Sequence, residues 1–190
     1  MTRTASKPLL IALAAVALLA TACGDSDDSA TDAGAVHGQA DIAFVQGMIP
    51  HHQQAITMSG YAARQASDPR VKDLAERIEA GQEPEIERMR GFLEDWDVEE
   101  DGESGGHGGG GGHPGMLTNE GLARLEGAEG EAFDRLFLQS MIEHHRGAIK
   151  ASETEQAEGQ SPEARALAGE IISAQRAEIA TMEPLLKEAG

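Results

Sequence analysis

The chain of 190 residues contains one segment twice, without a gap, at an offset of 93 residues. Residues 41–93 and 134–186 are identical at 19 of 53 positions. The longest shared motif is Met-Ile-x-His-His-x-x-Ala-Ile, at residues 48–56 and 141–149. Such a duplication predicts two copies of one structural unit that pack against each other. It also shows which residues both diverged copies retain.

Apolar residues recur at helical spacing in each copy. The stripes predict helices over about 40–66 and 70–96 in the first copy, and over about 131–159 and 161–188 in the second. A proline, Pro69 or Pro162, marks the start of each second helix. Neither hairpin can bury its apolar stripe alone, so we expect an all-α four-helix bundle built from two duplicated helical hairpins.

The first 22 residues are typical of an export signal. Arg3 and Lys7 precede an apolar run of 12 residues, which is too short to span a bilayer comfortably. The only cysteine, Cys23, follows directly, where a bacterial lipoprotein carries its lipidated residue. We therefore predict a lipoprotein signal peptide over 1–22, lipidation of Cys23 and a flexible tether over 23–39.

The remaining chain, 40–188, is expected to form the bundle. A glycine-rich linker over 97–117 separates repeat 1 (40–96) from repeat 2 (131–188), and a short helix over 118–127 follows it, with Thr118 as its cap. The linker contains His107 and His113. Histidines in a glycine-rich tract are only compositional support for metal binding, so their role stays open.

Charge limits the partners of this protein. The chain has 33 acidic and 15 basic residues, a net charge of −18, which becomes −20 once Arg3 and Lys7 are removed with the signal peptide. This charge argues against binding to nucleic acid or to an anionic lipid surface. With a single cysteine no disulfide can form within the chain, so stability must come from the core and from any bound metal.

Histidine and methionine dominate the retained residues. Each doublet, His51-His52 and His144-His145, has a methionine three residues before its first histidine. When each hairpin folds back at its proline, the helical rise places part of the second helix beside the Met-x-x-His-His motif of the first helix. The candidate metal ligands are His51, His52, His144, His145, Met48, Met141, Met89 and Met182, and the expected hydrogen-bonding partners of the imidazoles are Gln82, Glu85, Gln175 and Glu178.

A pseudo-twofold axis between the hairpins would gather these residues into one shared cluster. The metal follows from the ligand types. Di-iron bundles use Glu-x-x-His, whereas this chain has Met48 and Met141 where those glutamates would stand. Thioether with imidazole favours a soft ion, and copper, as Cu(I) or Cu(II), fits better than zinc.

The repeated motif resembles the domain of unknown function 305 family. The resemblance rests on Asp41, Phe44, Met48, His51, His52 and Ala55, followed by Gln82, Glu85, Ile86 and Met89. It implies a secreted bacterial protein with a ferritin-like helical fold of two-helix repeats. It further implies copper binding, since some relatives bind copper and are implicated in copper resistance. One departure is Ala151, which stands where repeat 1 has Met58.

The resulting hypothesis is a copper-binding protein anchored by lipid to the extracytoplasmic face of the cell membrane, which sequesters copper or hands it over. Two alternatives stay open at this point. One is an enzyme, a ferritin-like metal oxidase that oxidises Cu(I), although the missing Glu-x-x-His weighs against it. The other is a structural or partner-binding module whose core histidines hold no metal.

Overall fold

A computed structural model describes residues 36–100 and 114–189, all within one compact unit. The described part of the chain contains five helices and no strand: α1 (Gln39–Gln65), α2 (Pro69–Asp95), α3 (Asn119–Glu126), α4 (Gly130–Glu158) and α5 (Pro162–Glu188). The predicted all-α bundle of two duplicated hairpins is confirmed. The expected signal peptide, Cys23, His107 and His113 lie outside the described residues.

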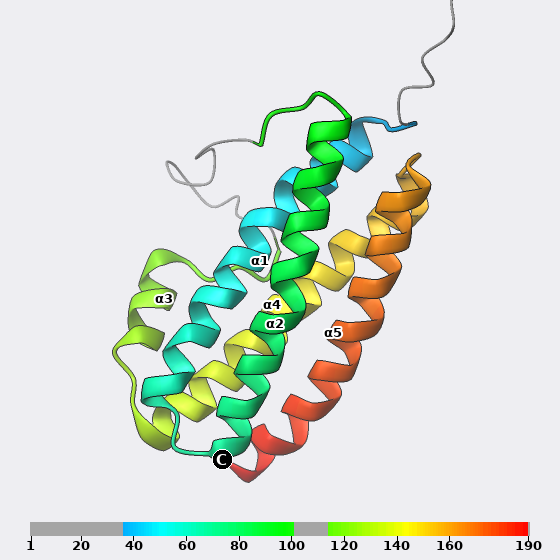
Figure 1. Cartoon of the computed structure of the whole chain (residues 1–190). Coiled ribbons are helices and arrows are strands. Elements are labelled where there is room, and N and C mark those ends of the chain that lie inside the picture. Colours follow the sequence, from blue (N-terminus) through cyan, green and yellow to red (C-terminus); the bar gives the residue numbers. More distant parts are fainter. Residues whose placement is uncertain (1–35, 101–113, 190) are drawn as a thin grey trace, which may run out of the picture. The chain divides into compact units, whose positions relative to one another are not determined.

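The two repeats form two hairpins that pack side by side (Figure 1). Helix α1 packs on α2, and α4 packs on α5, as the short loops require. The main contact between the hairpins is α1 against α4, and α2 and α5 meet less extensively. Helix α3 packs on α1 and α4, outside the four long helices (Figure 1). No helix in the described ranges is long and apolar enough to cross a membrane.

Short polar side chains set where three helices begin. Asp68 accepts a hydrogen bond from the backbone N–H of Arg70 (2.8 Å), and Ser161 accepts one from Ala164 (3.1 Å), so the two hairpins start their second helices in the same way. Thr118 accepts from the N–H of Gly121 (3.1 Å), which confirms it as the cap of α3.

The buried apolar residues form two clusters, one near each end of the bundle. The first joins the C-terminal half of α1 and the N-terminal half of α4, and includes Met58, Phe133, Phe137, Met141 and Met182. The second joins the N-terminal half of α1 to the C-terminal half of α2 and the N-terminal half of α5, and includes Phe44, Met48, Met89, Leu93 and Ile171. On both α1 and α4, the histidine doublet follows residues of one cluster and precedes residues of the other.

Each hairpin also binds the loop of the other. The Asp41 carboxylate at the start of α1 accepts hydrogen bonds from the backbone N–H groups of Gln160 (3.0 Å) and Ser161 (2.8 Å), in the loop between α4 and α5. The Asp134 carboxylate accepts from the N–H groups of Ser67 (3.1 Å) and Asp68 (2.9 Å), in the loop between α1 and α2. These contacts make α1 and α4 antiparallel and join the two repeats at both ends.

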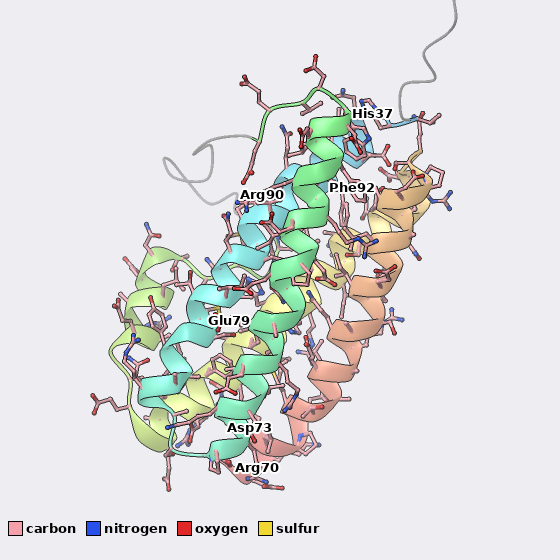
Figure 2. The ribbon with its side chains drawn as sticks, viewed as in Figure 1. His37, Arg70, Asp73, Glu79, Arg90 and Phe92 are labelled. Atoms are coloured by element: carbon pink, nitrogen blue, oxygen red, sulfur yellow. The ribbon has the colours of Figure 1, made fainter. Side chains whose placement is uncertain are left out.

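The ends of the bundle carry further contacts between segments distant in sequence. His37 stacks on Trp96 with ring centroids 4.9 Å apart, and Phe92 lies 5.6 Å from the same indole; Figure 2 labels His37 and Phe92 at this end. At the opposite end of α2, Arg70 forms an ion pair with Glu188 of α5 (2.7 Å). Both groups of that pair are exposed, so it contributes little to stability.

Candidate metal centre

All four doublet histidines are buried at the contact between the two hairpins. The rings of His51 on α1 and His144 on α4 face each other with centroids 3.8 Å apart and planes tilted by 41°. His145 lies one residue further along α4, with its ring 6.3 Å from that of His144. The structure therefore brings the two copies of the motif together, as a pseudo-twofold arrangement requires.

The second histidine of each doublet is held by a carboxylate of its own hairpin. The Nε2–H of His52 donates to Glu85 on α2, and that of His145 donates to Glu178 on α5, each at 2.7 Å. This bond selects the tautomer with the proton on Nε2 and leaves the lone pair on Nδ1. No other side chain in the described ranges bonds to the Nδ1 atoms of His52 and His145.

His144 is fully buried among the other three doublet histidines. Burial, followed by the neighbouring imidazoles of His51, His145 and His52, holds its pKa well below the ordinary value of 6.5. His144 is therefore neutral at physiological pH, which is the form that binds a metal. Its ring nitrogens have no side-chain hydrogen-bond partner among the described residues, and the backbone of His51 is their polar neighbour. An unpaired buried imidazole is costly unless water or a metal satisfies it.

The end of the linker passes directly over His51. The Nε2–H of His51 donates to the carbonyl of Pro114 (3.2 Å). This approach depends on Gly147 of α4, because a Cβ there would overlap the Pro114 carbonyl, and on Gly115, whose φ of +88° favours glycine. The sequence pattern did not indicate this contact.

The four expected imidazole partners on α2 and α5 divide into two glutamines and two glutamates. The amides of Gln82 and Gln175 are buried but bond to no imidazole, or to any other side chain within residues 36–100 and 114–189. The pairing of His52 with Glu85 explains this, because the same register sets Gln82 level with Ala55, one turn beyond the histidine. Glu85 and Glu178 make the bonds to the imidazoles, and the expected role of both glutamines as imidazole partners stays a prediction.

The methionines are divided between the two ends of the site. Met48 and Met89 are buried in one apolar cluster, and Met141 and Met182 are buried in the other. The four methionines thus do not share one apolar cluster, and their joint role as metal ligands stays a prediction. We call the four buried histidines, His51, His52, His144 and His145, the histidine layer. Because α1 and α4 are antiparallel, Met48 and Met141 lie on opposite sides of this layer.

The described side chains do not form a complete coordination sphere of nitrogen and oxygen ligands. No three His, Cys, Asp or Glu side chains in the described ranges converge to hold a metal ion. Two imidazoles are turned towards carboxylates and a third towards the Pro114 carbonyl. Neutral nitrogen donors with thioether sulfur on either side fit a soft metal that accepts a low coordination number.

These features define an all-α bundle of two helical hairpins with a buried histidine layer at their contact. The sequence matches the family described as "Domain of unknown function (DUF305)" over residues 41–186. The chain belongs to this DUF305 family.

Solved structures share the fold. A DUF305 protein of Streptomyces coelicolor, which carries the description of a secreted protein, is 30% identical with a TM-score of 0.72, and the match covers 80% of this chain and 94% of that one. CopM in its Cu(II)-bound form is 33% identical with a TM-score of 0.69, over 78% of this chain and 96% of CopM. CopM is also known in Cu(I)-bound and Ag-bound forms.

A viral relative matches a shorter segment. The uncharacterized protein L153 of Acanthamoeba polyphaga mimivirus is 44% identical over 55 residues. This match covers 29% of the present chain and 36% of L153, so it supports a shared segment and not a shared function for the whole protein.

Proposed function

We propose that this protein binds copper in the histidine layer between its two hairpins and serves to sequester the ion or to hand it over. The observation that carries the proposal is the contact of His51 with His144, two buried imidazoles from the two repeats with ring centroids 3.8 Å apart. The copper-bound and silver-bound forms of CopM, a structural neighbour at 30–33% identity, support it.

Several residues of the histidine layer would coordinate copper together. His144 offers ring nitrogens that bond to no side chain, and His52 and His145 offer their Nδ1 atoms while Glu85 and Glu178 fix the opposite side of each ring. A carboxylate on the far nitrogen raises the basicity of the ligand and prevents the ring from turning over. The Met48–Met89 and Met141–Met182 pairs would supply thioether sulfur from either side, which stabilises Cu(I) in preference to Cu(II).

The proposal includes a lipid anchor at Cys23, which would keep the protein on the extracytoplasmic face of the cell membrane. Two acyl chains are enough for stable attachment, where one chain is marginal. Intact-mass measurement of protein extracted from membranes tests this part: we expect a lipid-modified Cys23 as the first residue. An unmodified Cys23 within the mature chain would contradict it.

Copper binding itself is tested with protein purified from copper-fed cells. Metal analysis should find copper in the wild type, and titration under reducing and oxidising conditions gives the affinity for each ion. The variant with both His51→Ala and His144→Ala should lose tight binding. The matched control is His37→Ala, which removes a histidine that stacks on Trp96 at the end of the bundle. Equal copper content in the double variant and the wild type would refute the proposed site.

A further inference from the structure

A groove runs along the contact of α1 and α4 from the bundle surface to the histidine layer. It encloses about 280 Å³, and its inner end is formed by His51, Met48 and Pro114. Its outer end reaches Glu155, whose carboxyl group lies beside that of Asp41. Ten residues of α1 separate Asp41 from His51, so the groove is roughly 15 Å long at 1.5 Å per residue.

The repeat predicts a second groove at the symmetry-related position, but larger side chains occupy that space. Ala40, Ala43 and Ala151 line the open groove. The residues 93 positions away are Phe133, Leu136 and Met58. Phe133 and Met58 are fully buried and Leu136 packs against them, in the cluster that also receives Leu125 from α3. At all three pairs of equivalent positions, the open groove has alanine and the other site has a large apolar side chain.

The open groove presents chemistry suited to a soft cation. A thioether and an imidazole stand at its inner end, and a carboxyl group with only 1% of its residue exposed stands at the other. The Glu155 oxygens receive no hydrogen bond from a donor in the described part of the chain, so their neighbour is the Asp41 carboxyl, with which a protonated Glu155 shares its proton. The walls between are mostly alanine, glycine and Phe44, and the polar side chains of Lys150, Thr154 and Glu158 on α4 also line the groove.

The volume also allows an ion to pass with water. A water molecule needs roughly 10–15 Å³ of such space, so the groove can hold several. On the opposite side of the layer the symmetry-related space is occupied by Phe133 and Met58, together with Leu125 of α3. We propose that copper reaches the histidine layer through this groove, with Met48 and His51 as the receiving groups at its inner end. This inference rests on the proposed copper binding.

Filling the groove tests the route. Ala151→Leu and Ala43→Leu each place a side chain of the size found in the filled half, and leucine adds no sulfur donor. Ala157→Leu is the matched control, because it makes the same change on α4 at an exposed position outside the groove. The measurement is stopped-flow transfer of Cu(I) from a chromogenic chelator to the full chain, together with the equilibrium affinity and the thermal midpoint of each variant.

We expect both groove variants to load copper roughly tenfold or more slowly than the control, with release slowed to the same extent and the affinity within about twofold of the wild type. A blocked route changes both rate constants and leaves their ratio unchanged. Loading at the control rate in folded Ala151→Leu and Ala43→Leu proteins would overturn the route while copper binding stands. A wild type that binds no copper would overturn the proposed function, and the route with it.

Discussion

Asp41 and Asp134 are related by the 93-residue repeat, and each binds the hairpin loop of the other repeat. The loop residues are related by the same offset, since Gln160 and Ser161 correspond to Ser67 and Asp68. The pseudo-twofold axis is therefore fixed by hydrogen bonds at both ends of the α1–α4 contact. This arrangement determines that His51 meets His144, because sliding α1 along α4 would break the bonds at both aspartates.

Asp41→Asn and Asp134→Asn should each destabilise the bundle. An amide in place of the carboxylate loses the charge-assisted bonds to the backbone N–H groups of the opposite loop. Hydrogen bonds to charged groups contribute roughly 1.5–3 kcal/mol, so we expect a loss of about 2 kcal/mol for each variant. Urea unfolding measures it, with the exposed Asp73→Asn as the control. A midpoint equal to that of the control would show that the loop contacts do not hold the repeats together.

Glu155 should make the protein less stable as the pH rises. Burial first, and then the hydrogen bond and charge of Asp41, raise the pKa of Glu155 to about 8 from the ordinary 4.5. Between these pH values the folded state keeps a proton that the unfolded chain has lost, so the contribution of Glu155 to stability is present below pH 4.5 and disappears by about pH 8.

The Glu155→Gln variant should lack this decline. We expect it to be more stable than the wild type at pH 8 by about 1–3 kcal/mol, and to differ little near pH 4.5. Thermal or urea unfolding across this range checks the prediction. A difference that is constant with pH would mean that Glu155 titrates normally. The control is Glu158→Gln, an exposed glutamate on the same helix.

Glu85→Gln and Glu178→Gln should weaken copper binding without unfolding the protein. The amide keeps the size of the side chain but no longer places a negative charge on the imidazole, and such outer contacts typically change metal affinity by about 10–100-fold. Competition titration with a chelator of known affinity measures the effect. Glu79→Gln, at a position of α2 labelled in Figure 2 and six residues before Glu85, serves as the control. Unchanged affinity in both variants would remove the orienting role.

Met48→Leu and Met141→Leu should weaken Cu(I) binding more than Cu(II) binding, because thioether is a soft ligand. The two methionines lie in separate apolar clusters and share no partner there. Their effects on the free energy of Cu(I) binding should therefore add, within about 0.5 kcal/mol, in the double variant. A double variant no weaker than either single one would instead place both sulfurs in one coordination sphere.

Much of the fold could be predicted from the repeat and its helical periodicity. The prolines and caps at residues 68–69 and 161–162 set the hairpin turns, and the half-apolar stripes required the hairpins to pack together. Folding the hairpin at this turn set His52 level with position 83, which brought both Gln82 and Glu85 close to the histidines but did not show which of them bonds to His52. The role of Asp41 and Asp134 was missed, although both repeats keep this residue. The available signal was an acidic residue at the start of each helix, and such a residue is already explained by its favourable interaction with the helix dipole.

The arrangement across the hairpins was harder to predict, because it depends on how two helices cross. Equal spacing in both repeats indicated that the histidines meet but not that Met48 and Met141 fall on opposite sides of them, which is a consequence of antiparallel packing. The contact of Pro114 with His51 depends on a close approach to Gly147, and no periodic pattern reports it. The groove was visible only as a difference between the repeats, such as Ala151 in place of Met58.

The most direct test of copper binding at the contact of the two repeats is anomalous diffraction at the copper absorption edge, from crystals of the full chain loaded with Cu(I). We predict an anomalous peak between α1 and α4, within bonding distance of imidazole nitrogens contributed by both histidine doublets. The same experiment with the His51→Ala, His144→Ala double variant should show no peak there. Copper found only on surface carboxylates or at the bundle ends, with the histidine layer free of anomalous density, would contradict the assignment.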